Sequence, residues 1–275
     1  MAREDEIRRY LATGDHDMLC LAWHGGAHVE RMERGERELR EALVAEVNRR
    51  AGAPDVPASA HGIDLLALGR EKAEPMVRGL FPRAEQDTVL ALVERSVVFV
   101  TPNNIESLLL EIHWLSSAWK IANLYLASVG AELLGEDAPG ILGYSEETTC
   151  YVSLDYFRQG DPFADFVVHE IAHIFHNCKR RTAGLKEART REWLLDMDYG
   201  KRETFAYACE AYSRILQRAS AAKERRALAE EFAGFDVEDD RVNAEKIATL
   251  VRQACDRRNG WEVILSHCAP AMQGP

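Results

Sequence analysis

The sequence has no long uninterrupted apolar run, no excess of basic residues and no closely spaced pair of cysteines. Its most apolar long stretch, residues 105 to 134, contains several charged and polar side chains, so we expect no membrane span there. The formal net charge is -11. Nucleic acid is not expected as the main partner of such an acidic chain, because the phosphate backbone repels negative charge.

The cysteines and the first residues exclude two further classes of protein. The six cysteines lie far apart without a Cys-x-x-Cys pair, so we expect buried or free thiols rather than a disulfide framework. The first nine residues mix acids with bases and no apolar segment follows, which argues against a signal peptide. Together these absences predict a cytoplasmic protein with no membrane partner.

Apolar residues make up 47% of the 275 residues, which is enough to bury a sizeable core. Most of them recur at helical spacing, and only residues 97–100 and 148–154 have the β-branched and aromatic content of strands. The expected fold is therefore α+β and predominantly helical. A loop rich in proline and glycine is expected at residues 51–62, and a second loop around His24-Gly-Gly-Ala-His28. Helices are expected over residues 1–50, 63–79, 84–95, 104–130, 202–216, 221–233 and 240–257.

The segment from residue 165 to residue 176, Asp-Phe-Val-Val-His-Glu-Ile-Ala-His-Ile-Phe-His, carries the most specific chemical signal. On a helix, His169 and His173 lie one turn apart and can reach a single ion. Glu170 then lies on the flank, where a carboxylate can reach a water bound to that ion. Asp161 and Pro162 are expected to cap and begin this helix.

A simpler interpretation of this segment is a core helix with two hydrogen-bonded histidines. That interpretation is less favourable, because each polar group buried in an apolar run needs its own partner.

A catalytic zinc site needs a third protein ligand and an open position for water. Glu203 is the strongest candidate, because the Glu-Thr-Phe-Ala segment around it is otherwise small or apolar. Glu210 falls two turns later near the same helix face, so it is either the alternative ligand or an orienting partner of a histidine. His176 is left open between an oxyanion donor, an alternative ligand and a hydrogen-bonded structural histidine.

The residues at 169–173 and 203–206 resemble zincin metallopeptidases of the gluzincin kind, in which a glutamate on a later helix joins a His-Glu-x-x-His helix. The resemblance covers residues 97–217 and implies a zincin-like core with a small mixed sheet and an active-site helix. It implies one Zn²⁺ per chain on His169, His173 and Glu203. It also implies that the strand at residues 148–154 forms the edge along which an extended substrate lies.

The same resemblance implies a zinc-dependent endopeptidase acting on a protein or peptide substrate. Zinc activates a water molecule and polarises the scissile carbonyl, and Glu170 accepts the water's proton as general base. The oxyanion needs a further donor. Among Tyr199, Tyr207 and Tyr212, we favour Tyr199, because its Asp-Tyr-Gly turn could lie at the rim of a cleft.

We expect three parts in the chain: a helical N-terminal region (1–96), a zincin-like catalytic core (97–220) and a helical C-terminal region (221–275) packed on the core. A second hypothesis keeps the fold without turnover, as a regulatory or partner-binding protein with a structural zinc. A third is that the metal is structural and that Cys178 or His176 completes its coordination. The presence of Glu170 favours catalysis, since a structural metal site has no use for a base.

Overall fold

In this computed structural model, the described residues are 2–270 except 53–61, 137, 139, 147, 159, 188–190, 236 and 238. They form eleven α-helices and a small three-stranded mixed sheet, which confirms the predicted α+β, predominantly helical class. All six cysteines are free and buried, as predicted. Within the described part of the chain, no helix is both long and apolar enough to cross a membrane.

The predicted helices over residues 63–79, 84–95, 202–216, 221–233 and 240–257 are all present, with small shifts at their ends. The helices are α1 (Arg3–Thr13), α2 (His28–Ala51), α3 (Leu65–Leu80), α4 (Arg83–Ser96), α5 (Ile105–Glu111), α6 (Leu115–Ser128), α7 (Phe166–Asn177), α8 (Arg202–Arg218), α9 (Ala222–Phe232), α10 (Ala244–Cys255) and α11 (Gly260–Cys268). The short 3-10 helices are η2 (Leu154–Phe157) and η3 (Tyr199–Lys201). The loop predicted at residues 51–62 lies largely outside the described residues.

The sheet consists of β1 (Val97–Val100), β2 (Gly143–Glu146) and β3 (Thr149–Ser153), in the order β1-β3-β2. Both predicted strands are confirmed, and β2 was not predicted because its sequence lacks apolar alternation. The prediction that residues 148–154 form a substrate-binding edge is wrong. Strand β3 is paired on both sides, so its backbone groups are not available to a further strand.

By its internal contacts the chain divides into two compact units. The first comprises Met1–Gly62, Phe99–Tyr144 and Tyr151–Arg158, and the second comprises Ile63–Val98, Ser145–Cys150 and Gln159–Pro275. The division into parts at residues 96 and 220 stays a prediction.

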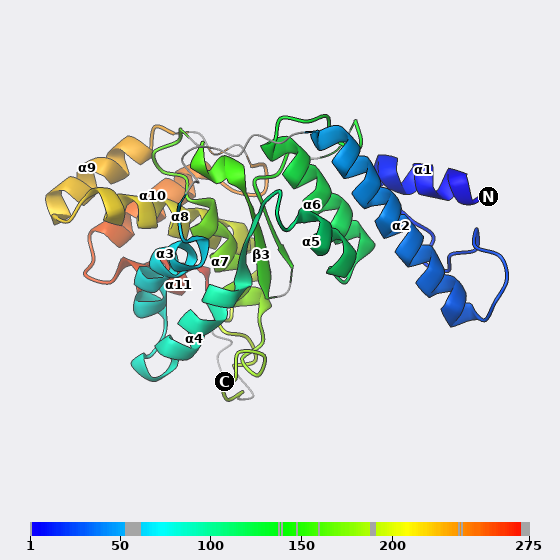
Figure 1. Ribbon diagram of the computed structural model, residues 1–275. Helices are drawn as coiled ribbons and strands as arrows, with labels where there is room; N and C mark the ends of the chain where they lie inside the picture. The colour runs from blue at the N-terminus through cyan, green and yellow to red at the C-terminus, as the bar shows by residue number, and fades with distance from the viewer. Residues whose placement is uncertain are drawn as a thin grey trace. The chain divides into compact units, whose positions relative to one another are not determined.

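In the first unit, α2 lies along α5 and α6 (Figure 1). The single helix predicted over residues 104–130 is wrong, because the chain leaves the helix between α5 and α6. Arg40 of α2 donates hydrogen bonds to the carbonyl oxygens of Leu109 and His113, at 2.9 and 3.0 Å. These tertiary bonds satisfy carbonyls at the break, although no proline or glycine is present there.

The predicted helix over residues 1–50 is also interrupted. Helix α1 ends at Gly14, which adopts the left-handed conformation with φ of 76°. Helix α2 begins only at His28, so the predicted loop is confirmed for residues 24–27.

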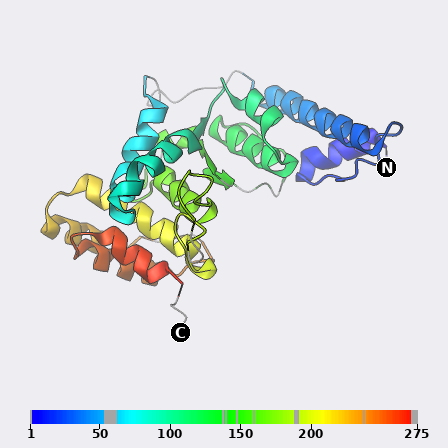
Figure 2. The same ribbon diagram turned by 90° about the horizontal axis from the view of Figure 1, so that it is seen from below.

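In the second unit, α7 packs against α8 and α3, and α9, α10 and α11 pack against α8 (Figure 2). Helix α7 is buried on most sides, which holds its polar side chains in fixed positions. Its fully buried apolar residues are Val167, Val168, Ile171, Ala172, Ile174 and Phe175.

Candidate metal centre

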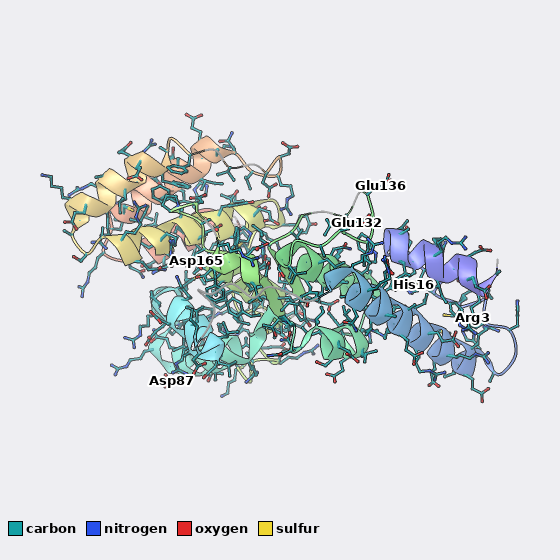
Figure 3. All side chains as sticks on the ribbon, turned by 45° about the horizontal axis from the view of Figure 1, so that its top comes forward. Arg3, His16, Asp87, Glu132, Glu136 and Asp165 are labelled. Atoms are coloured by element: carbon teal, nitrogen blue, oxygen red, sulfur yellow. The ribbon has the colours of Figure 1, made fainter. Side chains whose placement is uncertain are left out.

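Helix α7 begins four residues later than the sequence predicted. Asp165, which Figure 3 labels, is its N-cap and accepts a hydrogen bond from the Val168 amide at 3.4 Å. The predicted cap, Asp161, is wrong, because its side chain accepts from the Phe163 amide and closes a separate turn. Nζ of Lys72 on α3 lies 2.7 Å from Oδ2 of the buried Asp165, so its positive charge balances the negative charge of the carboxylate.

Two helices bring three possible metal ligands together. His169 and His173 of α7 and Glu203 of α8 each offer a ligand atom within 4.8 Å of the others. Oε2 of Glu203 lies 3.7 Å from Nε2 of His169 and 3.5 Å from Nε2 of His173. In a tetrahedral zinc site with bonds of about 2.0–2.1 Å, ligand atoms lie about 3.4 Å apart. These three residues could therefore hold one metal ion.

The surroundings of Glu203 fit a cation at this point. Its Oε1 accepts a hydrogen bond from Arg241 at 2.7 Å, whereas Oε2 is buried and has no hydrogen-bond partner among the described residues. An unpaired buried acceptor costs about 1–3 kcal/mol. A cation between Oε2 and the imidazoles would remove that cost, and two imidazoles with one carboxylate are a known catalytic zinc set.

Glu210 lies on the other side of the His169 ring. Its Oε2 is 3.0 Å from Nδ1 of His169, and its Oε1 accepts from the Asp165 amide at 2.6 Å. Since Nε2 of His169 faces Glu203, we assign the ring proton to Nδ1, which donates it to Glu210. Of the two roles that the sequence left open, Glu210 has the geometry of the orienting partner.

A second hydrogen-bonded chain orients His173. Its Nδ1 is 3.0 Å from Nε2 of His176, and Nδ1 of His176 is 3.0 Å from Oδ1 of Asn177. Because Nε2 of His173 faces Glu203, Nδ1 donates to His176, which in turn donates to Asn177. Both nitrogens of His176 are thus used, so it acts here as a partner of His173 rather than as a ligand.

The charges of the cluster shift its pKa values. Burial lowers the pKa of His169, but the carboxylates of Glu203 and Glu210 outweigh burial and raise it to about 10. Burial raises the pKa of Glu203, and the two histidines outweigh it and hold that pKa well below its usual range. Without an ion, His169 therefore carries a second proton at neutral pH, which a metal must displace.

Acid should destabilise the folded protein through His176. Burial and the neighbouring charge of His173 lower its pKa from 6.5 to about 3. The unfolded chain therefore binds more protons between these two values, and stability is lost as the pH falls, by up to about 1.4 kcal/mol per pH unit.

We expect metal-free His176→Gln to lose less stability than metal-free wild type between pH 6.5 and about pH 4, as measured by urea unfolding. An equal loss in the two proteins would contradict this role of His176.

Glu170 directly follows His169 and has no polar partner among the described residues. Its side chain is 8% exposed, and among the described residues its carboxylate has no hydrogen bond or ion pair. Its negative charge acts on His169. Burial and, to a lesser degree, the charge of Glu170 raise the pKa of the Cys150 thiol on β3. The Glu170 carboxylate is thus available to accept a proton next to a possible metal ligand.

The structure does not bring Tyr199 into this cluster. Its side chain is 83% exposed, and its ring packs against the guanidinium of Arg202 at 5.0 Å. Tyr207 lies closer, with its ring edge-on to His169 at 4.6 Å between centroids, and its hydroxyl donates to Asp239 at 3.2 Å. The role of Tyr199 as oxyanion donor stays a prediction.

Arg241 is a residue at this site that sequence reasoning missed. It lies 38 residues after Glu203 and donates to it, and it also pairs with Asp239 at 2.7 Å. No motif or periodicity marks it, because it is one arginine in a polar segment between two helices.

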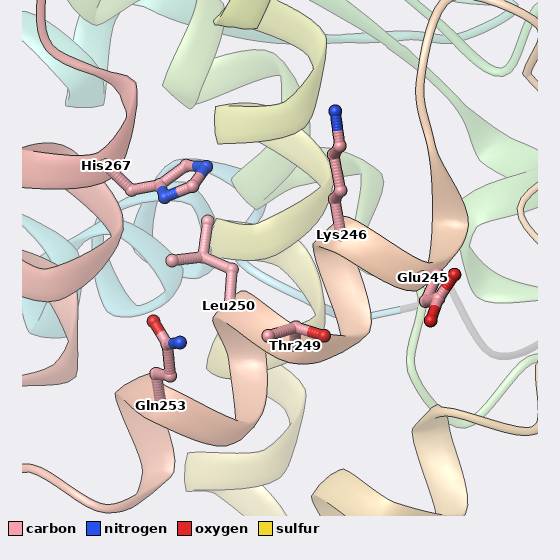
Figure 4. A pocket seen from close by; sticks show the side chains of 6 residues that line it. All are labelled: Glu245, Lys246, Thr249, Leu250, Gln253 and His267. Atoms are coloured by element: carbon pink, nitrogen blue, oxygen red, sulfur yellow. The ribbon is translucent and has the colours of Figure 1, made fainter.

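A separate pocket lies at α10 and α11 (Figure 4). One imidazole and one carboxylate are fewer ligands than a catalytic zinc site needs. We therefore assign this pocket no metal chemistry. Its lining residues are Glu245, Lys246, Thr249, Leu250, Gln253 and His267.

The gluzincin resemblance is carried by two short segments, residues 169–173 and 203–206. The structure brings side chains of both segments together, but two histidines and a carboxylate are not specific to zinc or to peptidases. In comparisons with known proteins, no family model, no curated protein and no solved structure matches this chain.

Proposed function

We propose that this protein is a zinc-dependent metallopeptidase that hydrolyses peptide bonds in a protein or peptide substrate. The observation that carries the proposal is the convergence of ligand atoms from His169, His173 and Glu203 within 4.8 Å of one another. Glu170, which follows the first of these ligands, supplies the carboxylate that hydrolysis needs and that metal binding alone does not.

Each residue of the cluster has a part in this chemistry. Zinc, when bound, would polarise the scissile carbonyl and lower the pKa of a water molecule. Glu170 would accept the proton of that water and return it to the leaving amine. Glu210 and His176 hold the two imidazoles with Nε2 turned toward Glu203, which preserves their lone pairs for the ion.

Two alternatives are less well supported. Two histidines and one carboxylate also bind Fe(II) in oxygenases, but a redox site has no need of the unpaired base at Glu170. A structural zinc would need a fourth protein ligand. The group of possible ligands includes neither Cys178 nor His176. The thiol of Cys178 instead donates to the Lys179 carbonyl.

The proposed setting is the cytoplasm. Six free, buried cysteines suit a reducing compartment. The net charge of -11 favours basic over acidic protein or peptide substrates.

Removal of the metal should abolish peptide hydrolysis. We expect purified protein to cleave some members of a peptide library, with cleavage detected by mass spectrometry. This activity should be lost after dialysis against a chelator. One molar equivalent of Zn²⁺ should restore it, because the described part of the chain contains one group of possible ligands. Mg²⁺ serves as the matched control and should not restore it, since that ion prefers oxygen ligands. Undiminished cleavage by protein shown to be free of metal would refute the proposal.

A further inference from the structure

Arg241 joins two acidic side chains at the candidate site. Its Nη1 donates to Oε1 of Glu203 at 2.7 Å. Its Nε and Nη2 donate to the carboxylate of Asp239 at 2.7–3.2 Å. Asp239, in turn, accepts from the hydroxyl of Tyr207, whose ring packs against His169. The guanidinium is therefore anchored through Asp239 while it holds Glu203.

The two oxygens of Glu203 consequently have different surroundings. Oε1 takes part in a charge-assisted hydrogen bond with Arg241, whereas Oε2 is buried, has no hydrogen-bond partner among the described residues and faces both imidazoles. Turning Oε1 toward an ion as well would compete with its hydrogen bond to Arg241.

Recognition of a substrate carboxylate is the other role that Arg241 could have. Asp239 and Glu203 already face its guanidinium with one negative charge each, so its positive charge is more than matched. All three of its nitrogens donate hydrogen bonds to these two side chains. Because these nitrogens already donate to groups of the protein itself, we favour a role of Arg241 within the protein.

We propose that Arg241 is a positioning residue that keeps Glu203 a one-oxygen ligand and so leaves a coordination position of the ion open for water. This inference rests on the proposed metal site. Without the guanidinium, Oε1 would be free to bind the ion beside the water, which would raise the coordination number from four to five and crowd the position that hydrolysis requires. Arg241 thus acts on the reaction through Glu203 and does not touch the substrate.

Cobalt provides a test that does not depend on activity, because the visible absorption of Co²⁺ is strong in four-coordinate sites and weak at higher coordination. We expect Co²⁺-loaded Arg241→Gln to lose this absorption several-fold relative to wild type. Arg241→Lys should retain most of it, since an ammonium group can still donate to Oε1 of Glu203. Chelator competition should give Arg241→Gln a zinc affinity equal to or higher than that of wild type, because a second oxygen is added and a positive charge removed.

Arg252→Gln is the matched control, because Arg252 pairs with Glu230 at 3.0 Å outside the site. Its cobalt spectrum should equal that of wild type. Asp239→Asn is a second variant that leaves the guanidinium but loosens its anchor, and it should lose part of the absorption. It decides the question if Arg241→Gln does not fold.

An unchanged spectrum of cobalt-saturated Arg241→Gln would overturn the inference, whatever the affinity of the variant for the ion. If wild type binds cobalt but cleaves no peptide, the proposed function fails while the spectra still decide the role of Arg241. If wild type binds neither Co²⁺ nor Zn²⁺, both proposals fall.

Discussion

The Glu170→Gln variant should bind zinc as wild type does and yet lose peptide hydrolysis. Glutamine has nearly the same size as glutamate, so the buried flank of α7 keeps its packing. Its amide, however, cannot accept a proton from water. Because a positioned general base contributes roughly 100- to 10,000-fold, we expect kcat for a cleaved library peptide to fall by such a factor.

Zinc content and initial rates should be measured on the same preparations of this variant. Glu94→Gln on α4 is the matched control, because Glu94 forms an exposed ion pair with Arg70 away from the ligands. Such pairs contribute little, so the control should keep both its zinc and its rate. If Glu170→Gln cleaves as fast as wild type, Glu170 is not the base. If it loses zinc, Glu170 supports the ion instead.

Replacement of a proposed ligand should remove the zinc altogether. Wild type should contain about one zinc per chain, because the described residues include one group of possible ligands. His169→Ala, His173→Ala and Glu203→Ala should contain almost none after dialysis, because two protein ligands do not complete a stable site. Glu210→Ala should still bind zinc but about 10- to 100-fold more weakly, since Glu210 contacts Nδ1 of His169 rather than the ion.

Elemental analysis and chelator competition measure these effects on zinc content and affinity. His267→Ala is the control for loss of an imidazole, because His267 lines the pocket at α10 and α11 instead. Undiminished zinc in His169→Ala would remove the assignment of the site. A larger loss in Glu210→Ala than in Glu203→Ala would exchange the roles of the two glutamates.

Most helices and the strands β1 and β3 could be predicted from the sequence, because spacing and residue type act locally. The break between α5 and α6 could not be predicted. It depends on hydrogen bonds from Arg40, which lies 69 residues before Leu109. The central position of β3 in the sheet could not be predicted either, since residue composition predicts a strand but not the strands that pair with it.

The candidate site also has one feature that the sequence predicts and another that depends on packing. The relation of His169 to His173 follows from the sequence alone, because residues four apart on a helix lie on one face whatever packs around it. Periodicity could not choose between Glu203 and Glu210, because seven residues bring the chain back to nearly the same face, displaced by about 10 Å. The packing of α8 on α7 places Glu203 at the Nε2 atoms and Glu210 at Nδ1 of His169, which the sequence could not show.

The sequence by itself determined the chemical types at this centre: two imidazoles one turn apart, a flanking carboxylate and a later glutamate. Only the tertiary structure decided which atoms meet, and it brought in Arg241 and Asp239 from the segment between α9 and α10. The physical reason is that helical periodicity relates neighbours within one helix. Contacts between separate segments depend on how the buried faces of α7 and α8 pack and where the chain returns to them.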